Sequence, residues 1–114
     1  MLLYALIVFL VGACGGLVLA SFVLRGKLAP WAVSLLHAML GATGIILLTT
    51  AILMDNLGTL PIIALCVFLV TAGFGFYLAS MHYGKRVAMK KVVLTHASFA
   101  ITGALLLIAA VVMH

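Results

Sequence analysis

The sequence predicts an all-α membrane protein that folds as an up-down bundle of four transmembrane helices. Three observations indicate this: the chain has 114 residues, 68% of them are hydrophobic, and only 6% are charged. A water-soluble domain of ordinary composition has about a quarter of its residues charged. About 20 apolar residues are enough to cross the hydrocarbon of a bilayer. We therefore expect a single domain of residues 1–114 with four spans and no soluble domain.

The apolar runs place four spans at residues 2–24, 31–54, 60–83 and 92–113. Pro30 and Pro61 lie at the starts of the second and third spans. The first residues of a helix make no hydrogen bond within it through their amide groups, so proline is tolerated there. Trp31 is typical of the membrane–water interface. The short connections predict that neighbouring helices are antiparallel. Gly12 and Gly16 form a GxxxG pair, which we interpret as allowing close helix packing.

All of the basic residues fall in the first and third connections: Arg25, Lys27, Lys85, Arg86, Lys90 and Lys91. The only acidic residue, Asp55, falls in the second connection. Since basic loops favour the cytoplasmic side, we expect these two connections in the cytoplasm and both termini outside a bacterial inner membrane. The net charge of +5 is then a topology signal, and no nucleic-acid partner is expected. The expected partners are the lipid bilayer and, for so small a chain, further copies of itself or the subunits of a membrane complex.

Spans two and four contain the same sequence motif. His37-Ala38 is followed after four residues by Thr43-Gly44, and His96-Ala97 is followed in the same way by Thr102-Gly103. In an up-down bundle these two helices are parallel and diagonal, so the two histidines can face one another at a similar depth, on the order of 8–10 Å below the basic surface. Seven residues nearly complete two helical turns, so each glycine lies on the face of its histidine. Such glycines leave room for a flat object, and Gly41 widens this room on helix two.

A flat ligand held by two histidines and cleared by glycines is haem. On His37, Gly44, His96 and Gly103, with Gly41 in support, the sequence resembles the membrane b-type cytochromes, in which a four-helix transmembrane bundle holds a bis-histidine haem. The resemblance implies that His37 and His96 are the metal ligands of haem b. We expect one haem per chain and electron transfer with a quinone or a redox partner protein.

A second haem is not expected, because the two remaining histidines, His82 and His114, lie at opposite faces of the membrane. His82 ends the third span beside the basic connection, so we interpret it as an interfacial residue. The alternative roles for His82 are a hydrogen bond to a haem propionate and exchangeable ligation of the iron.

Two other functions remain open from the sequence. The length and number of spans are similar to those of the small multidrug-resistance transporters, but those proteins need a carboxylate in the first span, and this chain has no acid there. The second is a non-catalytic assembly subunit in which the histidines only pack. Whether the protein is an enzyme stays open beyond a redox role, since no hydrolase, kinase or zinc-protease motif is present.

Overall fold

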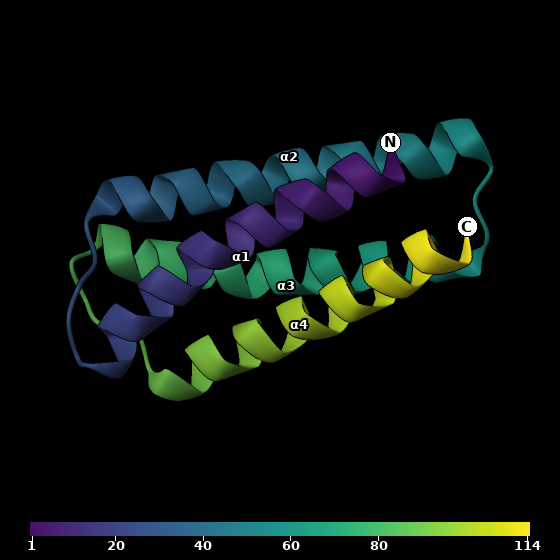
Figure 1. The fold of residues 1–114 in the computed structure, drawn as a ribbon. Coiled ribbons are helices and arrows are strands. Elements are labelled where there is room, and N and C mark those ends of the chain that lie inside the picture. Colours follow the sequence, from purple (N-terminus) through teal and green to yellow (C-terminus); the bar gives the residue numbers. More distant parts are fainter.

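A computed structural model describes all residues 1–114 and confirms the all-α, four-helix bundle (Figure 1). The helices are α1 (Leu2–Leu24), α2 (Trp31–Asp55), α3 (Thr59–Tyr83) and α4 (Lys90–Met113). Each helix is long and apolar enough to cross a membrane. α4 begins at Lys90, so Lys90 and Lys91 lie in its first turn and not in the preceding connection.

The helices end where the local sequence permits a change of backbone direction. Gly26 follows α1 with a positive φ of 72°, which glycine adopts without steric cost. α2 begins directly after Pro30, which has an extended ψ of 136°. Asn56 ends α2 in the left-handed conformation, which asparagine tolerates better than most residues. These turns are short, so each helix returns antiparallel to the one before it.

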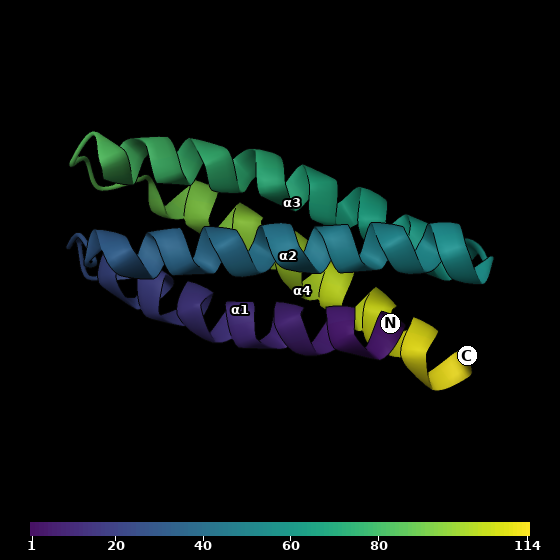
Figure 2. The ribbon, with the colours of Figure 1, turned by 90° about the horizontal axis from the view of Figure 1, so that it is seen from above.

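The bundle consists of two hairpins, α1–α2 and α3–α4, which lie against each other. The helices α1 and α3 run in the same direction, and α2 and α4 run in the opposite direction (Figure 2). Contacts within each hairpin are more extensive than the contacts of α2 with α3 and of α1 with α4. The helices α2 and α4 are diagonal, and none of their Cα atoms approach within 8 Å. Side chains alone therefore meet across the axis of the bundle.

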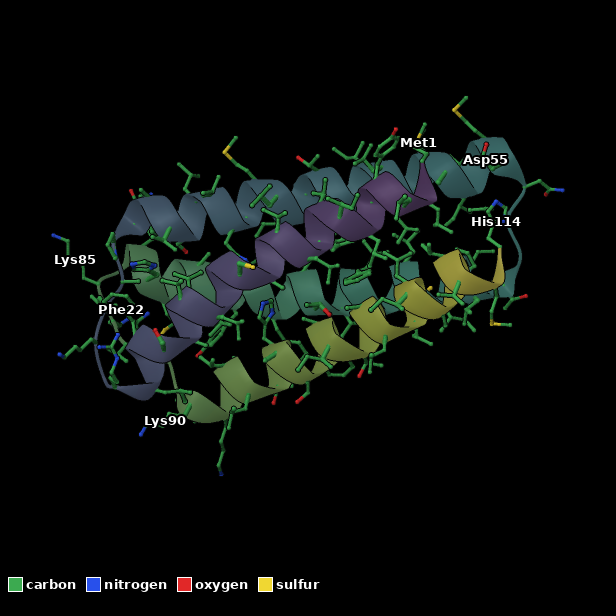
Figure 3. The ribbon with its side chains drawn as sticks, in the orientation of Figure 1. Met1, Phe22, Asp55, Lys85, Lys90 and His114 are labelled. Atoms are coloured by element: carbon green, nitrogen blue, oxygen red, sulfur yellow. The ribbon has the colours of Figure 1, made fainter.

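Two ends of the bundle are distinguished by charge. The basic end contains residues 25–30 and 84–89, and the terminal end contains residues 56–58 and both chain termini (Figure 3). Lys85 and Lys90 are drawn at the first end, whereas Met1, Asp55 and His114 are drawn at the second. The names basic end and terminal end are used below in this sense.

The repeat extends through the whole hairpin and not only through spans two and four. When residues 1–55 are matched without gaps to residues 60–114, 22 of the 55 pairs are identical. The runs Ala5-Leu6 and Val8–Val11 recur as Ala64-Leu65 and Val67–Val70. Equivalent residues also have equivalent burial, since Leu48 and Leu107 are both fully buried. The two hairpins are therefore structural repeats arranged about an approximate two-fold axis that runs along the bundle.

Candidate functional site

His37 of α2 and His96 of α4 meet across the axis of the bundle. Their ring centroids are 6.2 Å apart and their planes are inclined by 76°. Both side chains are half-buried, and the rings occupy equivalent positions in the two repeats. The structure thus brings together the two histidines that the sequence pairs, and it does so by side chains that reach inward from diagonal helices.

Each imidazole is held by the preceding helix of its own hairpin. The Nδ1 of His37 lies 2.8 Å from the carbonyl oxygen of Gly12, and the Nδ1 of His96 lies 2.9 Å from the carbonyl oxygen of Thr71. A carbonyl can only accept, so Nδ1–H is the donor in both bonds. In a neutral ring the proton is then on Nδ1, and the lone pair of Nε2 is free. A carbonyl bound to one ring nitrogen is the support that metal-ligating histidines commonly have.

One glycine on the first helix of each hairpin makes room for the imidazole ring of that hairpin. A Cβ atom on Gly16 would lie 3.0 Å from Cε1 of His37, and a Cβ atom on Gly75 would lie 3.1 Å from Cε1 of His96. Both distances are shorter than ordinary van der Waals contact. Gly12 and Gly16 therefore do more than bring two helices together, because one supplies the carbonyl and the other the space for the imidazole.

The glycines expected to face a flat ligand face phenylalanine rings of the chain itself. A Cβ atom on Gly44 would lie 2.7 Å from Cε1 of Phe9, and a Cβ atom on Gly103 would lie 2.9 Å from Cε1 of Phe68. Phe9 and Phe68 in turn stack across the axis, with ring centroids 3.9 Å apart. The space beside Gly44 and Gly103, which was expected to admit a planar ligand, is thus filled by an aromatic pair of the chain itself.

The remaining predicted residues lie apart from the histidine pair. Gly41 has no atom within 4 Å of its Cβ direction. His82 lies at the basic end, where its Nε2 is 2.7 Å from the carbonyl oxygen of Ala29 and its ring meets the ring of Trp31 edge-on at 5.1 Å. Eleven residues separate His82 from Thr71, which is about 16 Å along a helix. His82 therefore ties the end of α3 to the first connection and does not contact the pair.

The donor atoms of the site are two imidazole nitrogens and no more. No group of three or more histidine, cysteine or acidic side chains is placed to hold a metal ion. The roles of Phe9, Phe68 and the carbonyl of Thr71 were not predicted from the sequence. Phe9 and Phe68 have the same sequence separation as His37 and His96, and that equality was the signal that could have revealed them.

Comparison of the chain with protein-family models, with curated proteins and with solved structures finds no match.

Proposed function

We propose that this protein is a haem b-binding electron-transfer protein of a bacterial inner membrane, with His37 and His96 as the axial ligands of one haem. The observation that carries the proposal is the pair of facing imidazoles, each with Nδ1 bonded to a backbone carbonyl. The haem would supply a one-electron couple. With both axial positions taken by histidine, the iron has no open position for oxygen, which favours electron transfer over oxygen activation.

The separation of the rings supports coordination of one ion between them. A bond from a metal to an imidazole nitrogen is about 2 Å long, so two rings bonded to one ion from opposite sides have centres about 6 Å apart. The rings of His37 and His96 are 6.2 Å apart. The separation of the ring centres is therefore compatible with one iron atom between them.

The porphyrin ring fits into the space between the helices less readily than its iron fits between the histidines. Phe9 and Phe68 already fill the space beside Gly44 and Gly103, so those glycines do not clear the porphyrin as the sequence suggested. A porphyrin would have to enter between the two hairpins, whose mutual contacts are sparser than the contacts within each. In this arrangement the chain orients both imidazoles, and the Phe9–Phe68 pair keeps one side of the site dry.

The basic connections are proposed to face the cytoplasm, as the positive-inside rule indicates. The histidine pair would then exchange electrons in the cytoplasmic half of the membrane. A quinone dissolved in the bilayer or a redox partner protein are the proposed partners, either for a homo-oligomer or within a larger membrane complex. His82 lies at the basic end and could reach a propionate only if that group extended to this surface.

The visible spectrum of the purified protein mixed with haem tests the proposal. We expect a sharp Soret band and resolved α and β bands in the reduced state, of the kind that bis-histidine haem produces. Both His37→Ala and His96→Ala should remove these bands. His82→Ala is the matched control, because its ring lies away from the pair, and it should keep them. A wild-type protein without these bands, or bands that survive both substitutions, would contradict the proposal.

A non-catalytic assembly subunit is the second candidate, and one observation favours it. The bonds from Nδ1 to the carbonyls of Gly12 and Thr71 are also the bonds that a histidine used only for packing would make. In that case the protein binds no haem, and the double variant His37→Ala, His96→Ala loses stability or its partner complex without any spectroscopic change. The transporter alternative has no such support, because Asp55 is exposed at the end of α2 and no carboxylate lies inside a span.

A further inference from the structure

The hydrophobic core cluster of the bundle lies at the terminal end. Nine buried residues form one cluster: Leu2, Ala5, Leu6, Leu48, Ala51, Ala64, Phe68, Leu107 and Ala110. Every helix contributes to this cluster only from its half at the terminal end. Leu48 and Leu107 are the largest fully buried side chains. The core between the histidine pair and the terminal end is therefore apolar and closely packed.

On the other side of the histidine pair few residues are buried, and none of them belongs to this cluster: Ala29, Ser34, Ala88 and Val93. Ser34 is buried one helical turn from His37 in the direction of the basic end. Beyond it, the bond between His82 and the carbonyl of Ala29 lies at the mouth of the bundle. Fewer side chains are therefore buried here than in the nine-residue cluster, so water can enter the bundle more readily from the basic end than from the terminal end.

The Phe9–Phe68 pair lies where these two halves meet. Phe9 precedes Gly12, whose carbonyl holds His37, by three residues, which is about 5 Å along the helix. The two rings are nearly parallel, with an interplanar angle of 7° and centroids 3.9 Å apart. The two rings lie across the axis of the bundle, on the terminal-end side of the imidazoles, and each ring contacts a glycine of its own hairpin.

We propose that the Phe9–Phe68 pair is a water barrier, and that His37 and His96 are accessible to water only from the basic end. Apolar constrictions stop ions and protons in membrane channels by excluding water, and a stacked aromatic pair in an apolar core has this property. The inference concerns the access route to the site, and it does not depend on whether the site holds haem.

Proton permeability of liposomes tests the barrier. The protein, without added haem, is reconstituted into vesicles that contain a pH-sensitive dye, and an imposed pH gradient is followed as it decays. The wild-type protein should leave the decay rate close to that of protein-free vesicles. Phe9→Ala combined with Phe68→Ala should raise the rate several-fold, because the closure of the core is removed.

A second stacked phenylalanine pair gives the matched control. Phe74 and Phe99 stack with centroids 5.7 Å apart and planes inclined by 20°, away from the core cluster. Phe74→Ala combined with Phe99→Ala removes the same number of atoms and should leave the permeability at the wild-type value. An equal rise in both double variants, or no rise in a Phe9→Ala, Phe68→Ala protein of normal helical content, would overturn the proposal.

Thiol labelling provides a measurement that does not require the Phe9 and Phe68 variants to fold. Cys14 and Cys66 are both free and are first replaced by serine. Single cysteines are then introduced by Ser34→Cys and Leu48→Cys, and a small, charged, membrane-impermeant thiol reagent is added to either side. Trypsin cleavage of the basic connections identifies the side on which the basic end lies.

The labelling outcomes decide the access route. The Ser34→Cys protein should react from the basic side only, and the Leu48→Cys protein should react from neither side. Reaction of Leu48→Cys from the side of the terminal end, or absence of reaction of Ser34→Cys from the basic side, would show that water does not enter as proposed. Neither result bears on haem binding, which the visible spectrum reports separately.

Discussion

Phe9 and Phe68 stack face to face across the axis of the bundle, and each ring occupies the space left by a glycine on the second helix of its own hairpin. Each ring is thus in contact with both repeats. The glycine fixes its position within one hairpin, and the facing ring joins it to the other. This contact adds to the sparse helix-to-helix packing between the hairpins.

Gly44→Ala and Gly103→Ala should each destabilise the fold. The added Cβ atom would lie within 3 Å of a phenylalanine ring, so the ring or the helix would have to shift. Overpacking of this kind costs about 1–3 kcal/mol, and the repeat predicts similar costs for the two substitutions. Thermal unfolding in detergent, followed by circular dichroism, measures the loss.

Gly41→Ala is the control for these substitutions. It lies on the same helix as Gly44, but its Cβ direction is open, so the change should be neutral or mildly stabilising. A lower melting temperature for Gly41→Ala than for Gly44→Ala would show that the cost does not come from the phenylalanine contact.

Gly16→Ala and Gly75→Ala should disturb the imidazoles and leave the fold intact. The new methyl group pushes on Cε1 of His37 or His96 and weakens the bond from Nδ1 to the carbonyl. Loss of such a supporting bond commonly lowers metal affinity by about 10- to 100-fold. A haem titration measures the affinity, and the Nδ1 proton resonances of ¹⁵N-labelled histidine report the bond directly.

Gly73→Ala on α3 serves as the comparison, since nothing lies within 4 Å of its Cβ direction. It should leave both readouts at the wild-type value. If Gly73→Ala shifts the Nδ1 proton resonance of His96 as much as Gly75→Ala does, the close contact is not the cause.

Phe9→Ala and Phe68→Ala should be costly and coupled. Truncation of a buried phenylalanine such as Phe68 costs about 3–5 kcal/mol, and truncation of the half-buried Phe9 should cost less. Stacked pairs contribute about 0.5–1.5 kcal/mol beyond their buried area. A double-mutant cycle on the unfolding free energy should therefore show a coupling in that range. The Phe74–Phe99 pair packs outside the core cluster, and each of its single truncations should cost less. Additive effects at Phe9 and Phe68 would argue that the stack itself stabilises nothing.

His82→Ala should loosen the basic end without affecting the histidine pair. The substitution removes the bond to the carbonyl of Ala29, a loss of about 0.5–1.5 kcal/mol. Because the first connection is then less well held, trypsin should cleave at Arg25 and Lys27 faster than in the wild type. The haem spectrum should not change. His114→Ala, at the opposite end, should leave the cleavage rate unaltered.

The fold was predictable because the bilayer leaves few alternatives for a chain of this composition. With backbone groups that must bond within the segment, apolar runs of this length can only be helices. The difference at Lys90 and Lys91 has a simple physical reason. Long basic side chains can lie in the first turn of a transmembrane helix while their charged ends reach the interface.

The histidine pair was predictable from spacing, whereas its neighbours were not. The seven-residue step from His37 to Gly44 indicates that a flat group lies on that face of the helix. Sequence alone does not distinguish a ligand from a side chain of another helix, and here Phe9 fills the space. The carbonyl partners Gly12 and Thr71 could not be predicted either. Every residue has a backbone carbonyl, so the sequence does not indicate which one accepts the bond.

The approximate two-fold relation between the hairpins has an evolutionary consequence. In a symmetric pair of identical hairpins, any residue on the axis meets its own copy. A single histidine and a single phenylalanine in an ancestral hairpin would therefore have produced both facing pairs at once. Duplication and fusion of such a gene would leave two copies that can diverge, as the repeats differ at Trp31 and Lys90 while His37 and His96 are the same.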